Sequence, residues 1–124
     1  MLRLDERNWI KTGIEYVDSR QHVSAVVTRD YSDWSVAPQA YRSPTPLWLR
    51  LTRQGDFVQI DYAFDGQTYH LLRLTYFPPD VPVRIGPMAA APDGPGFAVQ
   101  FEQFSVQALP RQGASQQNTG SGTY

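Results

Sequence analysis

Apolar and polar residues alternate with a period of two along most of this chain. The alternation covers residues 9–16, 23–28, 47–52, 57–64 and 69–74, and these runs are rich in β-branched and aromatic residues. A period of two predicts β-strands, because successive side chains of a strand point to opposite faces. We expect about eight strands in all, at the spacing typical of an all-β sandwich.

Turn-forming residues separate these runs. Residues 18–21 connect the first two long runs, residues 53–56 form a hairpin connection whose Gly55 favours a positive φ, and Asp65-Gly66 marks another hairpin. The proline-rich segment 77–82 cannot be a central strand, since proline has no N–H to donate to a ladder. The spacing of these turn-forming residues therefore predicts short antiparallel strands.

The C-terminal part of the chain is expected to hold one more strand and a tail. After a tight turn at 92–96, Phe97 to Val106 alternates again, and its phase slips by one around Glu102-Gln103, which predicts a β-bulge. Residues 110–124 have little to bury and should be disordered. We therefore predict one β-sandwich domain over 1–109 and a disordered tail over 110–124, with a long polar loop over 34–46.

Composition excludes several classes of function. The 124 residues contain no cysteine, so disulfides, thiolate metal sites and cysteine nucleophiles are absent. Eleven basic and twelve acidic residues nearly cancel, which argues against a nucleic-acid partner. The chain has no apolar run of membrane-spanning length and no signal-peptide pattern, so we expect no membrane partner and a cytoplasmic location.

Four blocks in order carry a resemblance to a known family. They are Asn8–Glu15 (NWIKTGIE), Val26–Ser35 (VVTRDYSDWS), Leu47–Leu51 (LWLRL) with Asp65-Gly66 and Leu72-Arg73 after it, and Gly86–Ala90 (GPMAA). Together they resemble the domain-of-unknown-function 1349 family, which includes a fungal protein that regulates enolase. The resemblance covers the chain up to about Val106 and implies an antiparallel, concanavalin A-like jelly-roll β-sandwich.

The chain departs from the family pattern in two ways. Family members usually have a serine before the Asp-Gly turn and a tryptophan shortly after it, where this chain has Ala63-Phe64 and Tyr69. Family members also begin with strands upstream of the one that residues 1–4 continue, so the sandwich is expected to be incomplete at its N-terminal side. An uncovered last strand, Phe97–Val106, would then favour self-association.

Residues that could support catalysis or bind a metal are isolated. Glycosidic cleavage needs two carboxyl groups close together, and the nearest pair, Asp30 and Asp33, falls in an expected loop where turn formation or calcium binding are the alternatives. His22 and His70 stand alone at strand starts, and no serine lies in a nucleophile elbow. We therefore assign no catalytic residue, no metal site and no cofactor.

Tryptophans supply the best candidates for ligand binding. Trp9, Trp34 and Trp48 lie at polar-phase or loop positions, and an exposed indole can stack on a sugar ring. The alternative is that they belong to the core or its rim. Arg50 shares the phase of Trp48, while the ten arginines as a whole are scattered. The candidate ligand-binding set is Trp48, Arg50, Trp34, Asp33, Tyr31 and Trp9.

Three functions follow from this reading, in order of preference. The first is a non-catalytic concanavalin A-like module that binds a carbohydrate or a similar polar small ligand. The second is a protein-interaction or regulatory protein, as the resemblance to the enolase-regulating family member implies. The third is a glycoside-active enzyme, which the lack of a paired-carboxylate strand argues against.

Overall fold

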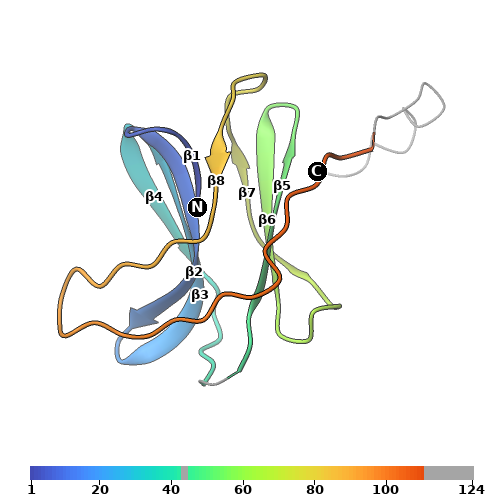
Figure 1. Ribbon diagram of the computed structural model, residues 1–124. Helices are drawn as coiled ribbons and strands as arrows, with labels where there is room; N and C mark the ends of the chain where they lie inside the picture. The colour runs from blue at the N-terminus through green and yellow to red at the C-terminus, as the bar shows by residue number, and fades with distance from the viewer. Residues whose placement is uncertain (43–44, 111–124) are drawn as a thin grey trace. The chain divides into compact units, whose positions relative to one another are not determined.

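A computed structural model describes residues 1–42 and 45–110 of the chain. These residues form eight β-strands and no helix, which confirms the all-β prediction (Figure 1). The strands are β1 (Leu2–Asp5), β2 (Asn8–Val17), β3 (Arg20–Arg29), β4 (Tyr31–Val36), β5 (Trp48–Gln54), β6 (Phe57–Ala63), β7 (His70–Tyr76) and β8 (Arg84–Ile85).

The strands build two antiparallel sheets within residues 1–88 (Figure 1). Sheet A has five strands in the order β4-β3-β2-β1-β8, and sheet B has three in the order β5-β6-β7. In sheet A, β2 and β3 pair without interruption up to Val17↔Arg20, and the two residues between them, Asp18 and Ser19, both have positive φ. A two-residue turn of this kind matches the twist of a hairpin and fixes its register.

The core lies between the two sheets. Leu2, Ile10, Ala25 and Val27 of sheet A are buried together with Val58 and Ile60 of sheet B and with Phe77, which follows β7. These residues belong to one phase of the alternation in each strand, so the opposite phase of each sheet faces outward. Within the outward phase, Ser24, Val26, Thr28 and Asp61 are nevertheless buried, so the outward direction alone does not make a side chain available to a ligand.

One strand replaces part of an expected loop. The prediction of a polar loop starting at Trp34 is wrong, because β4 runs over Tyr31–Val36 and pairs with β3. It is an edge strand of sheet A, so its side chains are mostly exposed and its sequence shows no apolar phase. The connection between β4 and β5 is correspondingly shorter than expected.

The second unit of the chain begins at Ala89. No strand forms over residues 97–106, so the predicted last strand is wrong for the described part of the chain. A strand needs a partner for its N–H and C=O groups, and no described residue pairs with this segment. Its apolar side chains are accordingly exposed, by 62% at Phe97 and 64% at Val106. Gln103 has a φ of 56°, which puts a backbone irregularity where the phase slips.

Two further expectations concern the limits of the domain. The boundary at residue 109 stays a prediction, and the expected tail lies outside the described residues from position 111 onward. The turn expected at 92–96 contains two glycines with positive φ, Gly94 and Gly96. That conformation favours glycine because it lacks a Cβ.

Candidate functional site

The outward side of the β5–β6 hairpin gathers polar and aromatic side chains. Register pairs Trp48 with Ala63 and Arg50 with Asp61, and directly opposed residues of an antiparallel pair share a face. Because Ile60, the neighbour of Asp61, points into the core, this face is the outer one. We call Trp48, Arg50, Gln59, Asp61 and Tyr69 the β5–β6 polar face; Tyr69 joins it through its contact with Arg50.

Asp61 lies at the centre of the β5–β6 polar face and is only 3% exposed. The amide Nε2 of Gln59 donates to both of its carboxylate oxygens at 3.1 Å, and a guanidinium N–H of Arg50 lies 3.4 Å from Oδ2. A buried carboxylate without such partners would be strongly unfavourable. Asp61 therefore anchors Arg50 and Gln59 against the sheet.

Arg50 presents a positively charged, planar group to solvent. Its guanidinium carbon lies 3.9 Å from the centroid of the Tyr69 ring, within cation–π distance, and its side chain is 51% exposed. Asp61 is its only hydrogen-bonding partner among the described residues. The remaining N–H groups of the guanidinium are thus available to an acceptor on a ligand.

The turn after β6 positions both aromatic members of the face. Asp65 accepts hydrogen bonds from the backbone N–H groups of Gln67 at 2.9 Å and Thr68 at 2.7 Å, and these bonds hold the pKa of Asp65 below its usual value. Gly66, with φ +73°, lies against the Trp48 indole, and a Cβ there would be 2.9 Å from Cε2. The turn therefore fixes the indole and delivers Tyr69 beside Arg50.

The other sequence-predicted residues lie on sheet A, separate from this face. Trp9 and Trp34 occupy the outward phase, and the Trp34 indole N–H donates to a Glu15 carboxylate oxygen at 2.8 Å. Tyr31, on the same edge strand as Trp34, is 88% exposed. The six predicted residues thus divide between the two sheets and do not form one site.

Asp33 has a structural role that the sequence did not indicate. It lies in the inward phase of β4, and its carboxylate accepts a hydrogen bond from Arg73 of β7 at 2.8 Å. The same guanidinium donates to the Ser35 hydroxyl at 2.7 Å. The hydrogen bond and the charge of Arg73 hold the pKa of Asp33 below its usual value. Asp33 therefore links the two sheets.

Sequence reasoning missed Gln59, Asp61 and Tyr69. A signal for Asp61 was available, because a two-residue hairpin at Gly55-Asp56 fixes the pairing of Arg50 with Asp61. Tyr69 had a weaker signal, as the position where this chain departs from the tryptophan usual in the family it resembles. Within the described residues, no group of three or more His, Asp or Glu side chains is arranged to hold a metal ion.

Comparison with known proteins identifies the family. The model of the family described as "Protein of unknown function (DUF1349)" matches residues 1–109. This chain belongs to that family. The family membership predicted from the resemblance is therefore confirmed.

Two curated relatives are similar over most of the chain. Regulation of enolase protein 1 of Saccharomyces cerevisiae is 36% identical over 108 residues, which cover 87% of this chain and 54% of that protein. An uncharacterized protein of Emericella nidulans is 32% identical over 108 residues, which cover 82% of this chain and 54% of that protein. The chain thus spans about half the length of these relatives.

A solved structure supports the fold. The crystal structure of a functionally unknown protein from Saccharomyces cerevisiae matches with a TM-score of 0.57 and 36% identity, over 62% of this chain and 41% of that one. No helix in the described part of this DUF1349 member is long and apolar enough to cross a membrane.

Proposed function

We propose that this DUF1349 member is a non-catalytic binding module for a carbohydrate or a similar polar small ligand, which binds at the β5–β6 polar face. One observation carries the proposal: the half-exposed Arg50 is stacked on Tyr69, has guanidinium donors available, and shares its face of the sheet with Trp48. An aromatic surface next to charged donors suits a ring with hydroxyl or carboxylate substituents.

The same face argues against hydrolysis. Glycosidases use two carboxyl groups separated by roughly 5–9.5 Å, one of them able to give a proton to the leaving group. Asp61 is the only carboxylate on the β5–β6 polar face, and it is buried and bonded to Gln59 and Arg50. A ligand held here would be bound and released unchanged.

The test is a titration of the protein with defined sugars, in which calorimetry measures binding. Glucose, cellobiose and glucuronate sample neutral and anionic rings, and at least one should bind and change tryptophan emission. Arg50→Gln and Tyr69→Leu should each weaken binding by about tenfold, the value of one charged hydrogen bond or stacking contact. Arg7→Gln is the matched control, because Arg7 is an exposed arginine whose ion pair with Asp30 spans 3.8 Å.

Two results would overturn the proposal. One is an absence of binding by all three sugars at millimolar concentration. The other is binding that Arg50→Gln and Arg7→Gln weaken equally. Trp48→Ala distinguishes a ligand-binding indole from a core-packing one. If the indole contacts the ligand, the variant loses affinity with little loss of stability. If the indole is part of the core, the variant is destabilised by about 3–5 kcal/mol.

A second candidate function is regulation of an enzyme through protein contact. The similarity to Regulation of enolase protein 1 favours it, at 36% identity. It predicts no response to sugars, but a change in the activity of purified enolase when this chain is added in stoichiometric amount. Unchanged enolase kinetics, with no complex in size-exclusion chromatography, would contradict it.

A further inference from the structure

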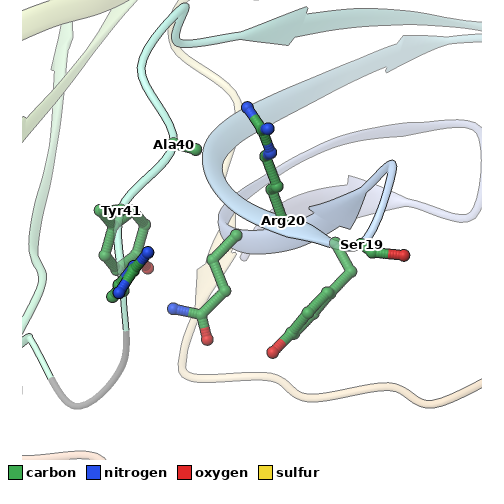
Figure 2. A pocket seen from close by; sticks show the side chains of 7 residues that line it. Ser19, Arg20, Ala40 and Tyr41 are labelled. Carbon is green, nitrogen blue, oxygen red and sulfur yellow. The ribbon is translucent and has the colours of Figure 1, made fainter.

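A pocket opens at the end of the β2–β3 hairpin, and none of its lining residues belongs to the β5–β6 polar face. Its volume is about 690 Å³, within the range of small-molecule sites. Figure 2 shows it with Ser19 and Arg20 on the hairpin side and Ala40 and Tyr41 on the facing segment. The polar residues that line it are Tyr16, Ser19, Arg20, Gln21, Tyr41 and Arg42.

Backbone hydrogen bonds hold the two sides of the pocket together. The N–H of Ala37 donates to the carbonyl of Val23 at 2.8 Å, and the N–H of Tyr41 donates to the carbonyl of Gln21 at 3.0 Å. These bonds tie the segment after β4 back onto β3. Tyr41 and Arg42 are therefore held opposite Arg20 and Ser19 by the fold itself.

The lining is rich in donors and carries positive charge. Arg20 and Arg42 contribute two guanidinium groups, Tyr16, Ser19 and Tyr41 contribute hydroxyls, and no carboxylate lines the pocket. Neither arginine forms an ion pair with any described residue. Guanidinium groups bind phosphate and sulfate oxygens with paired hydrogen bonds, so the chemistry of the lining selects an oxyanion.

Tyr41 provides a second, independent observation. Its hydroxyl oxygen is buried and has no hydrogen-bond partner among the described residues. The ring packs on Phe64 with centroids 5.0 Å apart, which fixes it beside the pocket. Burial raises the pKa of Tyr41 to about 12, so the hydroxyl keeps its proton and can donate. Native proteins leave few buried polar atoms unpaired. Because this oxygen is buried, a ligand oxygen would pair with it once a neighbouring lining side chain moves aside.

We propose that this pocket binds a small molecule bearing a phosphate or sulfate group, whose oxygens accept hydrogen bonds from Arg20, Arg42 and the Tyr41 hydroxyl. Its volume exceeds that of a free inorganic anion and leaves room for the body of the molecule. The proposal shares no residue with the sugar site proposed above.

Calorimetry with four probes tests the pocket: inorganic phosphate, glucose 6-phosphate, glucose 6-sulfate and glucose. Both esters should bind, and a preference between them would tell phosphate from sulfate recognition. Affinity should fall as salt is added, because the attraction is electrostatic. The double variant Arg20→Gln/Arg42→Gln should weaken ester binding by at least about tenfold, whereas Arg7→Gln should leave it unchanged.

Tyr41→Phe removes the hydroxyl and keeps the ring that packs on Phe64. It should weaken ester binding severalfold without lowering the thermal midpoint of the free protein, because no bond is lost in that state. Failure of both esters to bind at millimolar concentration would overturn the proposal. So would an ester affinity of the Arg20→Gln/Arg42→Gln variant equal to that of the unchanged protein. Glucose binding that depends on Arg50, together with no ester binding that depends on Arg20 and Arg42, would leave the sugar site standing while this one fails.

Discussion

Gly66 controls the position of the Trp48 indole, and replacing it with alanine tests this directly. The residue has φ +73°, and an added Cβ would lie 2.9 Å from Cε2 and 3.2 Å from Cζ2 and Nε1 of the indole. Gly55 is a matched control, since it has φ +57° and no atom within 4 Å of an added Cβ. Both substitutions strain the backbone in the same way, but only one crowds a side chain.

The expected losses of stability follow from the backbone strain and from the crowding of the indole. An alanine in the left-handed region costs about 1–2 kcal/mol, and the reduced freedom of the unfolded chain offsets about 0.4–1 kcal/mol of this. Gly55→Ala should therefore cost about 1 kcal/mol. Overpacking costs roughly 1–3 kcal/mol more. Since Trp48 is half-buried and can give way toward solvent, Gly66→Ala should exceed the control by about 1 kcal/mol.

Urea unfolding followed by tryptophan emission measures both variants. The double variant Gly66→Ala/Trp48→Leu closes a thermodynamic cycle, in which the extra cost at Gly66 should disappear. Native emission should also change in Gly66→Ala and stay unchanged in Gly55→Ala, because only the former displaces an indole. Equal destabilisation of the two variants, within about 0.3 kcal/mol, would refute the assigned contact, as would an excess cost that persists without Trp48.

Three further predictions concern the rest of the chain. Because the pKa of Asp33 is lowered in the fold, the stability that its charge contributes is present above the ordinary pKa of 3.8 and is lost as pH falls through the lowered pKa. Asp33→Asn should therefore lower the melting temperature at neutral pH. An equal lowering of the melting temperature in acid would contradict this. No glycoside in a chromogenic panel should be hydrolysed, and turnover that disappears in Asp61→Asn would show otherwise. The exposed apolar residues of 97–106 should drive self-association, so light scattering at micromolar concentration should show more than the 14.1 kDa monomer, and Val99→Lys should reduce it.

The strands that sequence predicted best are those whose buried, core-facing residues are all aliphatic. In β3 the core residues are Val23, Ala25 and Val27, and in β6 they are Val58 and Ile60. Within each strand, these residues occupy every second position. β4 escaped detection because an edge strand with exposed side chains carries no apolar period. The segment 97–106 shows the opposite failure: alternation signals a strand only if a partner pairs with it.

The candidate site was predictable only where it depends on local geometry. Trp48 and Arg50 lie two positions apart on one strand, so their shared face follows from the pleat. The partner of Asp33 could not be inferred, because Arg73 lies 40 positions away and meets it across the two sheets. Contacts of that range depend on how the sheets pack, which no local pattern encodes.

Arginine contacts separate structural residues from candidate binding residues. Arg29 stacks on Tyr76, Arg53 donates to the carbonyl of Pro78, and Arg73 bridges the sheets. Each of these guanidinium groups is used within the fold.

By contrast, the side chains of Arg20, Arg42 and Arg84 have no hydrogen-bonding or ion-pair partner in the part of the chain that is described. Arg20 and Arg42 both line one pocket, which Tyr41 with its buried, unpaired hydroxyl also lines. Arg84 lines a smaller hollow of about 250 Å³, whose only other polar side chain is that of Arg3. Replacing Arg84 with glutamine removes the same charge as Arg20→Gln. A loss of sugar-phosphate affinity in Arg20→Gln but not in Arg84→Gln would show that a position in the pocket lining, and not net charge, determines binding.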